Sequence, residues 1–300
     1  MCLWAPGSLY ARHVLLADLV GLAAAVIFSL LGWFYLHVRI EKTLGLMLFL
    51  PAFICIMSVF SITLQFIVFY FGASYPIVDE YLAQVDKQLW FDWVYYFNIL
   101  ICNKLLFELT KFSYNSIWYQ PLTLAILFII SHRVFDFCRL HLALSISFFL
   151  ACIGALLMPA LGAYQFHGMN PGRHAEVTLA FTDGMTAPIL WLRQSEVPAI
   201  MPSFEDIRLI TFPSLHASAA VIFVLVAWPL RGYRWMFCAV NGLMLLATPV
   251  HGSHYLIDVI VGGCLGAVSV ALGSLVLGRR PVVERFSNLP GALESYAHSS

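Results

Sequence analysis

Residues 255–277 read YLIDVIVGGCLGAVSVALGSLVL, a long apolar run in which Asp258 is the single charged residue. About 20 predominantly apolar residues are enough for an α-helix to cross the hydrocarbon core of a membrane. At that depth every backbone amide and carbonyl needs a partner within the segment, so this stretch predicts a transmembrane helix. An acid one turn into such a helix is costly and usually functional, which makes Asp258 the first candidate site residue.

Six further apolar segments extend the same pattern along the chain. They lie near Leu15–Val38, Leu44–Phe71, Tyr114–Ser131, Phe137–Leu161, Pro213–Leu230 and Trp235–Val250. The composition agrees with them, because 61% of the 300 residues are hydrophobic and 11% are charged, which is unlike a soluble globular domain. We therefore expect an all-α, polytopic membrane helix bundle of about seven transmembrane helices.

Two stretches are predicted not to cross the membrane. In Tyr75–Lys111, the charged residues Lys104, Glu108 and Lys111 recur at helical spacing and fall on one helix face. This pattern is typical of a helix that lies in the membrane interface. The second stretch, Gly162–Thr211, contains proline, glycine and three arginines, and we expect it to form the main soluble loop.

The basic residues in the connections predict the orientation of the chain. With seven spans, nine Lys and Arg fall in the short connections and the tail on one side, against seven in the long segments opposite. Cation density in short loops marks the cytoplasmic side. We expect a first helix with a short loop at residues 1–43, a membrane-embedded domain at 44–277 and a cytoplasmic tail at 278–300.

The motif FPSLHAS, at residues 212–218, lies at the start of a predicted helix. Pro213 suits the first turn of a helix, where its missing N–H costs nothing. The free amides of that turn, at Ser214 and Leu215, and the positive end of the helix dipole would favour a phosphate group. His216 would then face the same region from one turn inside the helix.

The motif HGSHYLID, at residues 251–258, lies at the start of the next helix but one. His254 and Asp258 are four residues apart and therefore share a helix face. Asp258 can bind one ring nitrogen of His254 and hold the other outward as a nucleophile. The seven-span arrangement brings this motif and FPSLHAS to the same side of the membrane, away from the cytoplasm.

Together, FPSLHAS and HGSHYLID resemble the second and third signature motifs of the type 2 phosphatidic acid phosphatase superfamily, in order and in spacing. Within it, the match is closest to the fungal inositol phosphorylceramide synthases and their bacterial relatives, which have FPSLH where the phosphatases have PSGH. The resemblance is sharp from Pro213 to Gly263. The stretch Val78–Trp90 is similar as well, through its spaced acids and leucines Asp79, Leu82, Asp86 and Leu89.

This resemblance implies a membrane-embedded lipid phosphatase or phosphotransferase with a six-helix catalytic core. His254 would attack phosphorus to give a phosphohistidine, Asp258 would orient it, and His216 would protonate the departing oxygen. No metal ion and no cofactor is implied. The substrate would be a lipid phosphate or phosphodiester, with a lipid alcohol as acceptor in the transferase case. The resemblance and the orientation together place the site on the extracytoplasmic face of a bacterial cytoplasmic membrane.

The sequence departs from the family pattern in the cations that hold the phosphate. The first family motif, Lys-x6-Arg-Pro, does not occur in Gly162–Thr211, and the arginine of the third motif is absent near Thr248. Lys104 and Lys111 have a Lys-x6-Lys spacing but precede the third expected span. The candidate phosphate-binding residues are therefore, in order, Arg208, Arg193 and Lys104, assisted by the amides of Ser214 and Leu215.

The sequence also allows two other interpretations of these residues. His251 and His254, three residues apart, could ligate zinc with Asp258 or His216. The chain could also be a non-catalytic lipid-binding or transport protein of the same fold, although the complete triad argues against it.

The seven cysteines show no paired spacing, which predicts packing residues. A net charge of zero gives no indication of nucleic-acid binding. The lipid and the oligomeric state are not indicated.

Overall fold

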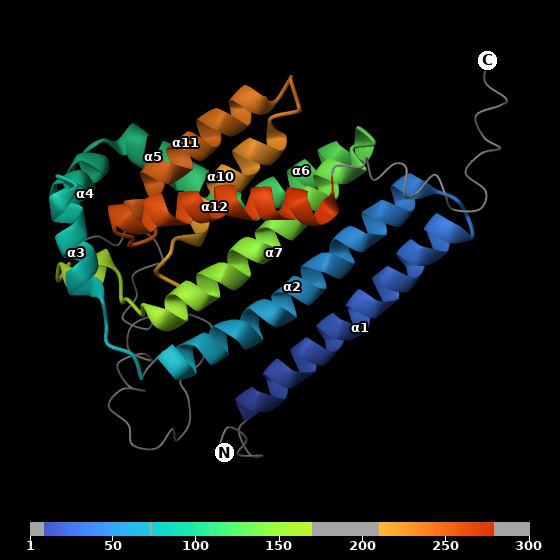
Figure 1. The fold of residues 1–300 in the computed structure, drawn as a ribbon, viewed down its shortest axis with the longest axis horizontal. Helices are drawn as coiled ribbons and strands as arrows, with labels where there is room; N and C mark the ends of the chain where they lie inside the picture. The colour runs from blue at the N-terminus through green and yellow to red at the C-terminus, as the bar shows by residue number, and fades with distance from the viewer. Residues whose placement is uncertain (1–8, 73, 170–209, 279–300) are drawn as a thin grey trace.

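The computed structural model describes residues 9–72, 74–169 and 210–278, and in these ranges the secondary structure is helical with no strand. The first two helices are α1 (Leu9–His37) and α2 (Lys42–Gly72), which pack against each other as a long antiparallel pair. This pair forms one edge of the bundle, and the remaining helices lie on the α2 side of it (Figure 1). The fold is thus the expected all-α helical bundle.

The centre of the bundle is built from α7 (Val134–Leu157), α10 (Leu215–Ala227), α11 (Arg234–His251) and α12 (Leu256–Leu277). α12 packs on both α10 and α7, and α7 in turn contacts α2. Two glycines let α12 approach α10 closely, because a Cβ at Gly262 or Gly266 would collide with the backbone carbonyl of Ser214 or Ser218. Small residues at helix contacts of this kind are typical of membrane bundles.

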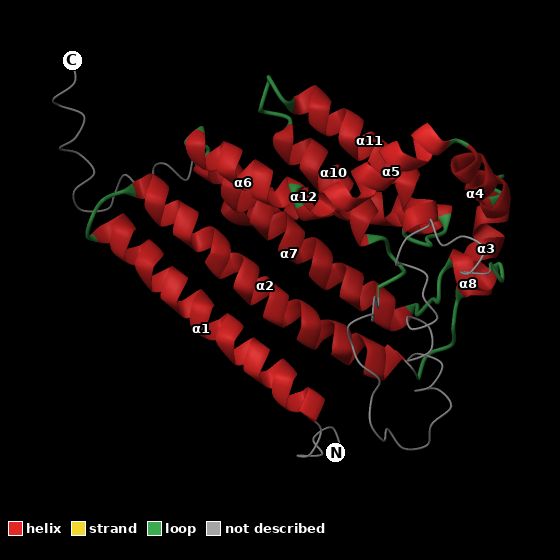
Figure 2. Cartoon of the chain, turned by 180° about the vertical axis from the view of Figure 1, so that it is seen from behind, coloured by secondary structure: helices red, strands yellow, loops and turns green. Residues whose placement is uncertain are grey.

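Shorter helices cover one end of the bundle. They are α3 (Asp79–Gln88), α4 (Trp93–Cys102), α5 (Lys104–Asn115) and α8 (Ala163–Phe166). The 3-10 turn η1 (Ser116–Trp118) follows α5 and leads into α6 (Gln120–Ile130), which packs on α7 and α2. Figure 2 shows α8 beside α3, at the end of the bundle where α4 also lies. The chain between the second and third expected spans is thus folded over the bundle end where α12 begins.

The stretch Tyr75–Lys111 forms three short helices, and the expected helix with Lys104, Glu108 and Lys111 on one face is the third of them, α5. Trp90 adopts a left-handed backbone conformation with φ of 59° after α3. Asp92 then caps α4 by accepting from the Tyr95 amide at 2.9 Å, and Asn103 caps α5 by accepting from the Leu106 amide at 3.0 Å. Such caps favour a new helix start because they satisfy amides that have no partner within the helix.

The expectation of seven spans is only partly met. Four helices in the described part of the chain are long and apolar enough to cross a membrane, at Asp18–His37, Leu44–Ser61, Val134–Leu157 and Leu256–Leu277. The other three expected segments, at 114–131, 213–230 and 235–250, give the helices α6, α10 and α11. Pro121 in the first turn of α6 and Pro229 after α10 mark where these helices begin and end, because proline cannot donate a helical hydrogen bond. The four long apolar helices support an integral membrane protein.

Buried side chains form three clusters, of which the smallest joins α2 and α7 through Val68, Cys152 and Ala155; the other two hold the rest of the bundle together. The larger one joins α6, α7 and α10 through residues such as Phe128, Leu140 and Phe223. The second joins α3, α4 and α5 to the start of α12, with Trp93 and Tyr255 among its members. The six described cysteines are free, and Cys102 and Cys264 are exposed, so packing does not account for all of them.

The close contact of α12 with α10 makes a first prediction. In Gly266→Ala the new methyl group would press on the Ser218 carbonyl, and we expect the free energy of unfolding to fall by about 1–3 kcal/mol. Gly263→Ala is the matched control, because its Cβ would make an ordinary 3.5 Å contact with Val221 and alanine is the better helix former. Thermal unfolding in detergent compares the two variants. Equal stability would show that the helices are not in close contact at Gly266.

Candidate active site

His254 lies in the loop two residues before α12, and Asp258 is the third residue of that helix, so the two do not share a helix face as expected. His254 Nδ1 and Asp258 Oδ2 are 3.3 Å apart, and the same oxygen accepts from the Tyr255 amide at 3.0 Å. The second bond is a reciprocal cap in which an acid in the first turn satisfies the amide that precedes the helix. Asp258 is completely buried and His254 is 4% exposed. The contact leaves Nε2 as the ring nitrogen turned away from Asp258.

The backbone of His254 is held from α4. The indole N–H of Trp93 donates to the carbonyl of His254 at 3.2 Å and to the carbonyl of Pro249 at 3.1 Å. Trp93 is itself buried, and its ring stacks on Phe97 and on His167. The connection between α11 and α12 is therefore fixed on both sides of the histidine.

His216 lies in the first turn of α10, whose N-cap is Ser214. The Ser214 hydroxyl accepts from the Ala217 amide at 3.4 Å, as expected for a capping serine. The His216 ring is half-buried and lies flat against the ring of Tyr114, with centroids 3.8 Å apart and planes within 8°. Tyr114 comes from the last turn of α5, so this helix supplies one wall of the site.

The two motifs meet directly. The Ser214 amide donates to the backbone carbonyl of Asp258 at 3.2 Å, which joins the start of α10 to the first turn of α12. A Cβ placed on Gly252 would lie 2.5 Å from His254 Cδ2 and 3.0 Å from the Tyr114 hydroxyl. Tyr114 therefore covers His216 with its ring and approaches His254 with its hydroxyl. His216, His254 and Asp258 gather at one end of the bundle.

The expected phosphate-binding residues have different outcomes. Arg193 and Arg208 lie outside the described residues. Lys104 is exposed at the first position of α5, about 15 Å along the helix axis from Tyr114. The structure therefore does not bring Lys104 to the histidines. The Ser214 amide is engaged by Asp258, so Leu215 is the better amide candidate.

Sequence reasoning passed over Lys111 as a phosphate ligand. Lys111 is half-buried and lies one turn before Tyr114 on α5, and its ammonium group is 5.9 Å from the centre of the Phe107 ring. Its charge acts on His251, which places it near the end of α11. The Lys-x6-Lys spacing was the available signal, but nothing in the sequence told which of the two lysines faces the protein.

His251 does not join His254 in a zinc site. Its Nε2 is 3.1 Å from the Thr110 hydroxyl, and its ring packs at 5.0 Å from the ring of Phe107. Across the described part of the chain, no group of three His, Cys, Asp or Glu residues could hold a metal ion. His251 instead fixes α11 against α5, beside the site.

The comparisons with known proteins identify the family. A family model described as the PAP2 superfamily matches residues 80–272, which is more than half of the chain and runs from α3 into α12. No curated protein and no solved structure was found to match. The matched region contains both motifs together with Lys111 and Tyr114. This chain belongs to the PAP2 superfamily and is, at that level, a phosphatase-type lipid phosphoesterase embedded in a membrane.

Proposed function

We propose that this protein cleaves a phosphoester of a membrane lipid through a covalent phosphohistidine on His254. The observation that carries the proposal is the buried His254–Asp258 contact of 3.3 Å beside His216, at two helix starts joined by a backbone hydrogen bond. Asp258 holds Nδ1 and its negative charge stabilises the imidazolium that develops during attack. The unshared pair on Nε2 then attacks phosphorus.

The proposed reaction has two displacement steps at phosphorus. In the first, a bond forms between Nε2 of His254 and phosphorus while the bond to the leaving oxygen breaks, and His216 gives that oxygen a proton. In the second, His216 takes a proton from the acceptor, whose oxygen displaces Nε2 and releases the phosphoryl group. His216 suits this exchange because histidine titrates near neutral pH.

Lys111 and the amide of Leu215 are the proposed phosphate-binding groups. Lys111 lies on the face of α5 that carries Tyr114, which stacks on His216. Leu215 is the first residue of α10, where free amides and the helix dipole favour an anion. Arg208 and Arg193 stay proposals for the same role.

Water or a lipid alcohol could serve as the acceptor, and the two choices define a phosphatase and a transferase. The FPSLH motif favours the transferase, because it resembles the synthase branch that moves a phospho-alcohol head group to a lipid hydroxyl. The covalent intermediate is common to both reactions. Distinguishing them requires a product analysis with and without an added alcohol.

The deciding experiment incubates purified protein with a panel of lipid phosphates and phosphodiesters, with and without a lipid alcohol. Release of free phosphate would indicate the phosphatase, and a new lipid product the transferase. His254→Ala should form no phosphoenzyme, and Asp258→Asn should lose several orders of magnitude in rate, as in the serine-protease triad where the loss is about 10⁴-fold. Absence of turnover on every substrate would support a non-catalytic lipid-binding protein instead.

A second prediction tests His216 as the proton donor. His216→Ala should reduce turnover of a natural alkyl ester far more than that of a nitrophenyl ester, because a good leaving group needs no proton. The quantity to compare is the ratio of the two rates in the variant and in the parent protein. Equal losses on both substrates would mean that His216 binds phosphate and that another group is the acid.

A third prediction concerns the two lysines of α5. Lys111→Met should weaken binding of a phosphate analogue such as vanadate by about 10- to 100-fold, because a hydrogen bond to a charged group contributes about 1.5–3 kcal/mol. Lys104→Met removes the same charge from the exposed start of the helix and serves as the matched control. Vanadate inhibition measured at constant ionic strength separates them. A larger effect at Lys104 would contradict the assignment.

A further inference from the structure

The start of α12 is capped by a residue from a distant helix. The carboxylate of Asp86, in α3, accepts from the Leu256 amide at 2.8 Å and from the Ile257 amide at 3.0 Å. These are the first two amides of α12, which have no partner within the helix. A negative charge there also complements the positive end of the helix dipole. Asp86 is 3% exposed, so these bonds are sheltered from water.

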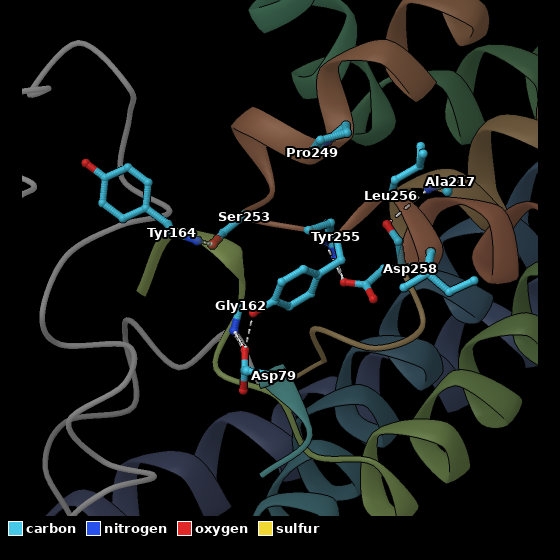
Figure 3. Close-up of polar contacts among 12 residues, drawn as sticks. Asp79, Gly162, Tyr164, Ala217, Pro249, Ser253, Tyr255, Leu256 and Asp258 are labelled. Atoms are coloured by element: carbon cyan, nitrogen blue, oxygen red, sulfur yellow. Dashed lines mark hydrogen bonds and ion pairs between the residues drawn. The ribbon is translucent and has the colours of Figure 1, made fainter. Parts of the chain in front are cut away.

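Asp79, two turns earlier in α3, is hydrogen-bonded to Tyr255, the residue next to His254. Its Oδ1 accepts from the Tyr255 hydroxyl at 2.9 Å and from the Gly162 amide at 2.8 Å, and its Oδ2 accepts from the Leu161 amide at 2.8 Å. Figure 3 shows Tyr255 between Asp79 and Asp258, with its hydroxyl turned to Asp79. One carboxylate thus links α3, the connection before α8 and the start of α12.

Each of the two carboxylates is buried and accepts hydrogen bonds on both of its oxygens. Burial raises the pKa of Asp79 and of Asp86, and the hydrogen bonds that each accepts oppose this shift. In each residue both oxygens face an N–H donor. An amide side chain would therefore point its NH₂ group at one of these donors, so asparagine cannot replace either acid without loss of a bond.

We propose that Asp86 is a positioning residue for the nucleophile, and that Asp79 supports it through Tyr255. The inference rests on the proposed function of His254. Asp86 fixes the two residues that lie between Tyr255 and Asp258, so it sets how the first turn of α12 presents Asp258 to His254. The reaction would then depend on α3, a helix outside the two motifs that carry the histidines.

The test compares Asp86→Asn with Glu80→Gln, which removes a charge from an exposed position of the same helix. We expect kcat for the lipid substrate to fall by about 10- to 100-fold in Asp86→Asn with KM unchanged, because a small misplacement of a catalytic group has effects of this size. Glu80→Gln should stay within about twofold of the parent. Asp86→Glu keeps the charge and should recover part of the rate.

Hydrogen exchange of the peptide that contains Leu256 and Ile257 provides a readout that needs no activity. We expect faster exchange there in Asp86→Asn, and no change in α7. Faster exchange with a normal kcat would show that Asp86 is only a structural cap, which would overturn the proposal. Unchanged exchange would also overturn it, because Asp86 would then not hold the start of α12. If the parent protein turns over no lipid in the panel, the proposed function is wrong and the positioning role of Asp86 is wrong with it. The hydrogen-exchange data would still show whether Asp86 caps α12.

If Asp86→Asn folds poorly, Tyr255→Phe provides a second test of the proposal. Tyr255→Phe removes only the hydroxyl that donates to Asp79 and keeps the buried ring, so the protein should fold. We expect a smaller fall in kcat than in Asp86→Asn, again with KM unchanged. A parent-like kcat in Tyr255→Phe, together with a rise in KM in Asp86→Glu, would place α3 in substrate binding and overturn the proposal.

Discussion

The contact between the starts of α10 and α12 is the constraint on which the candidate site depends. A hydrogen bond from the Ser214 amide to the Asp258 carbonyl joins the two helices at the point where each presents its histidine. That approach is possible because Gly262 carries no side chain where the Ser214 carbonyl lies. A larger residue would push the helices apart by the width of a methyl group and separate His216 from His254. The spacing of the two histidines is thus set by backbone contact.

Such a site places polar groups where burial is expensive, and the structure satisfies most of them with one another. An unpaired buried carboxylate would take up a proton or destabilise the fold. Asp79 and Asp86 are not unpaired, because they accept from backbone amides that would themselves lack partners at helix starts and connections. Each hydrogen bond therefore gives a partner to a buried carboxylate and to a backbone amide at the same time. The arrangement also explains why a short polar helix, α3, belongs to the same buried cluster as Trp93 and Tyr255.

Local sequence patterns were sufficient for the long apolar helices and for the contact between His254 and Asp258. The apolar run of α12 predicts a helix, and the four-residue spacing of His254 and Asp258 predicts their contact. The expected shared helix face is wrong, because His254 precedes α12 and only Asp258 lies within it. The lengths of α6 and α10 were harder to predict, because Pro121 and Pro229 mark helix ends inside longer apolar runs. The contacts of Asp86 with α12 join residues about 170 positions apart. No periodicity reports a contact of that kind, although the spacing of Asp79 and Asp86 marked them for attention.

The proposed phosphate-binding residue Lys111 also could not be chosen from the sequence alone. The family pattern places a lysine and an arginine shortly before the second motif, and no such string precedes FPSLHAS here. α5 lies much earlier in the chain, but it packs on α11, whose last residue leads into the loop that carries His254. Two lysines seven residues apart on a helix share a face but are separated by about 10 Å along its axis, so only one of them can reach a site at the end of the helix. Tyr114 stacks on His216 from that end, and Lys111 is the lysine one turn away. A cation can therefore serve the same phosphate from another part of the sequence, provided that its helix reaches the site in the fold.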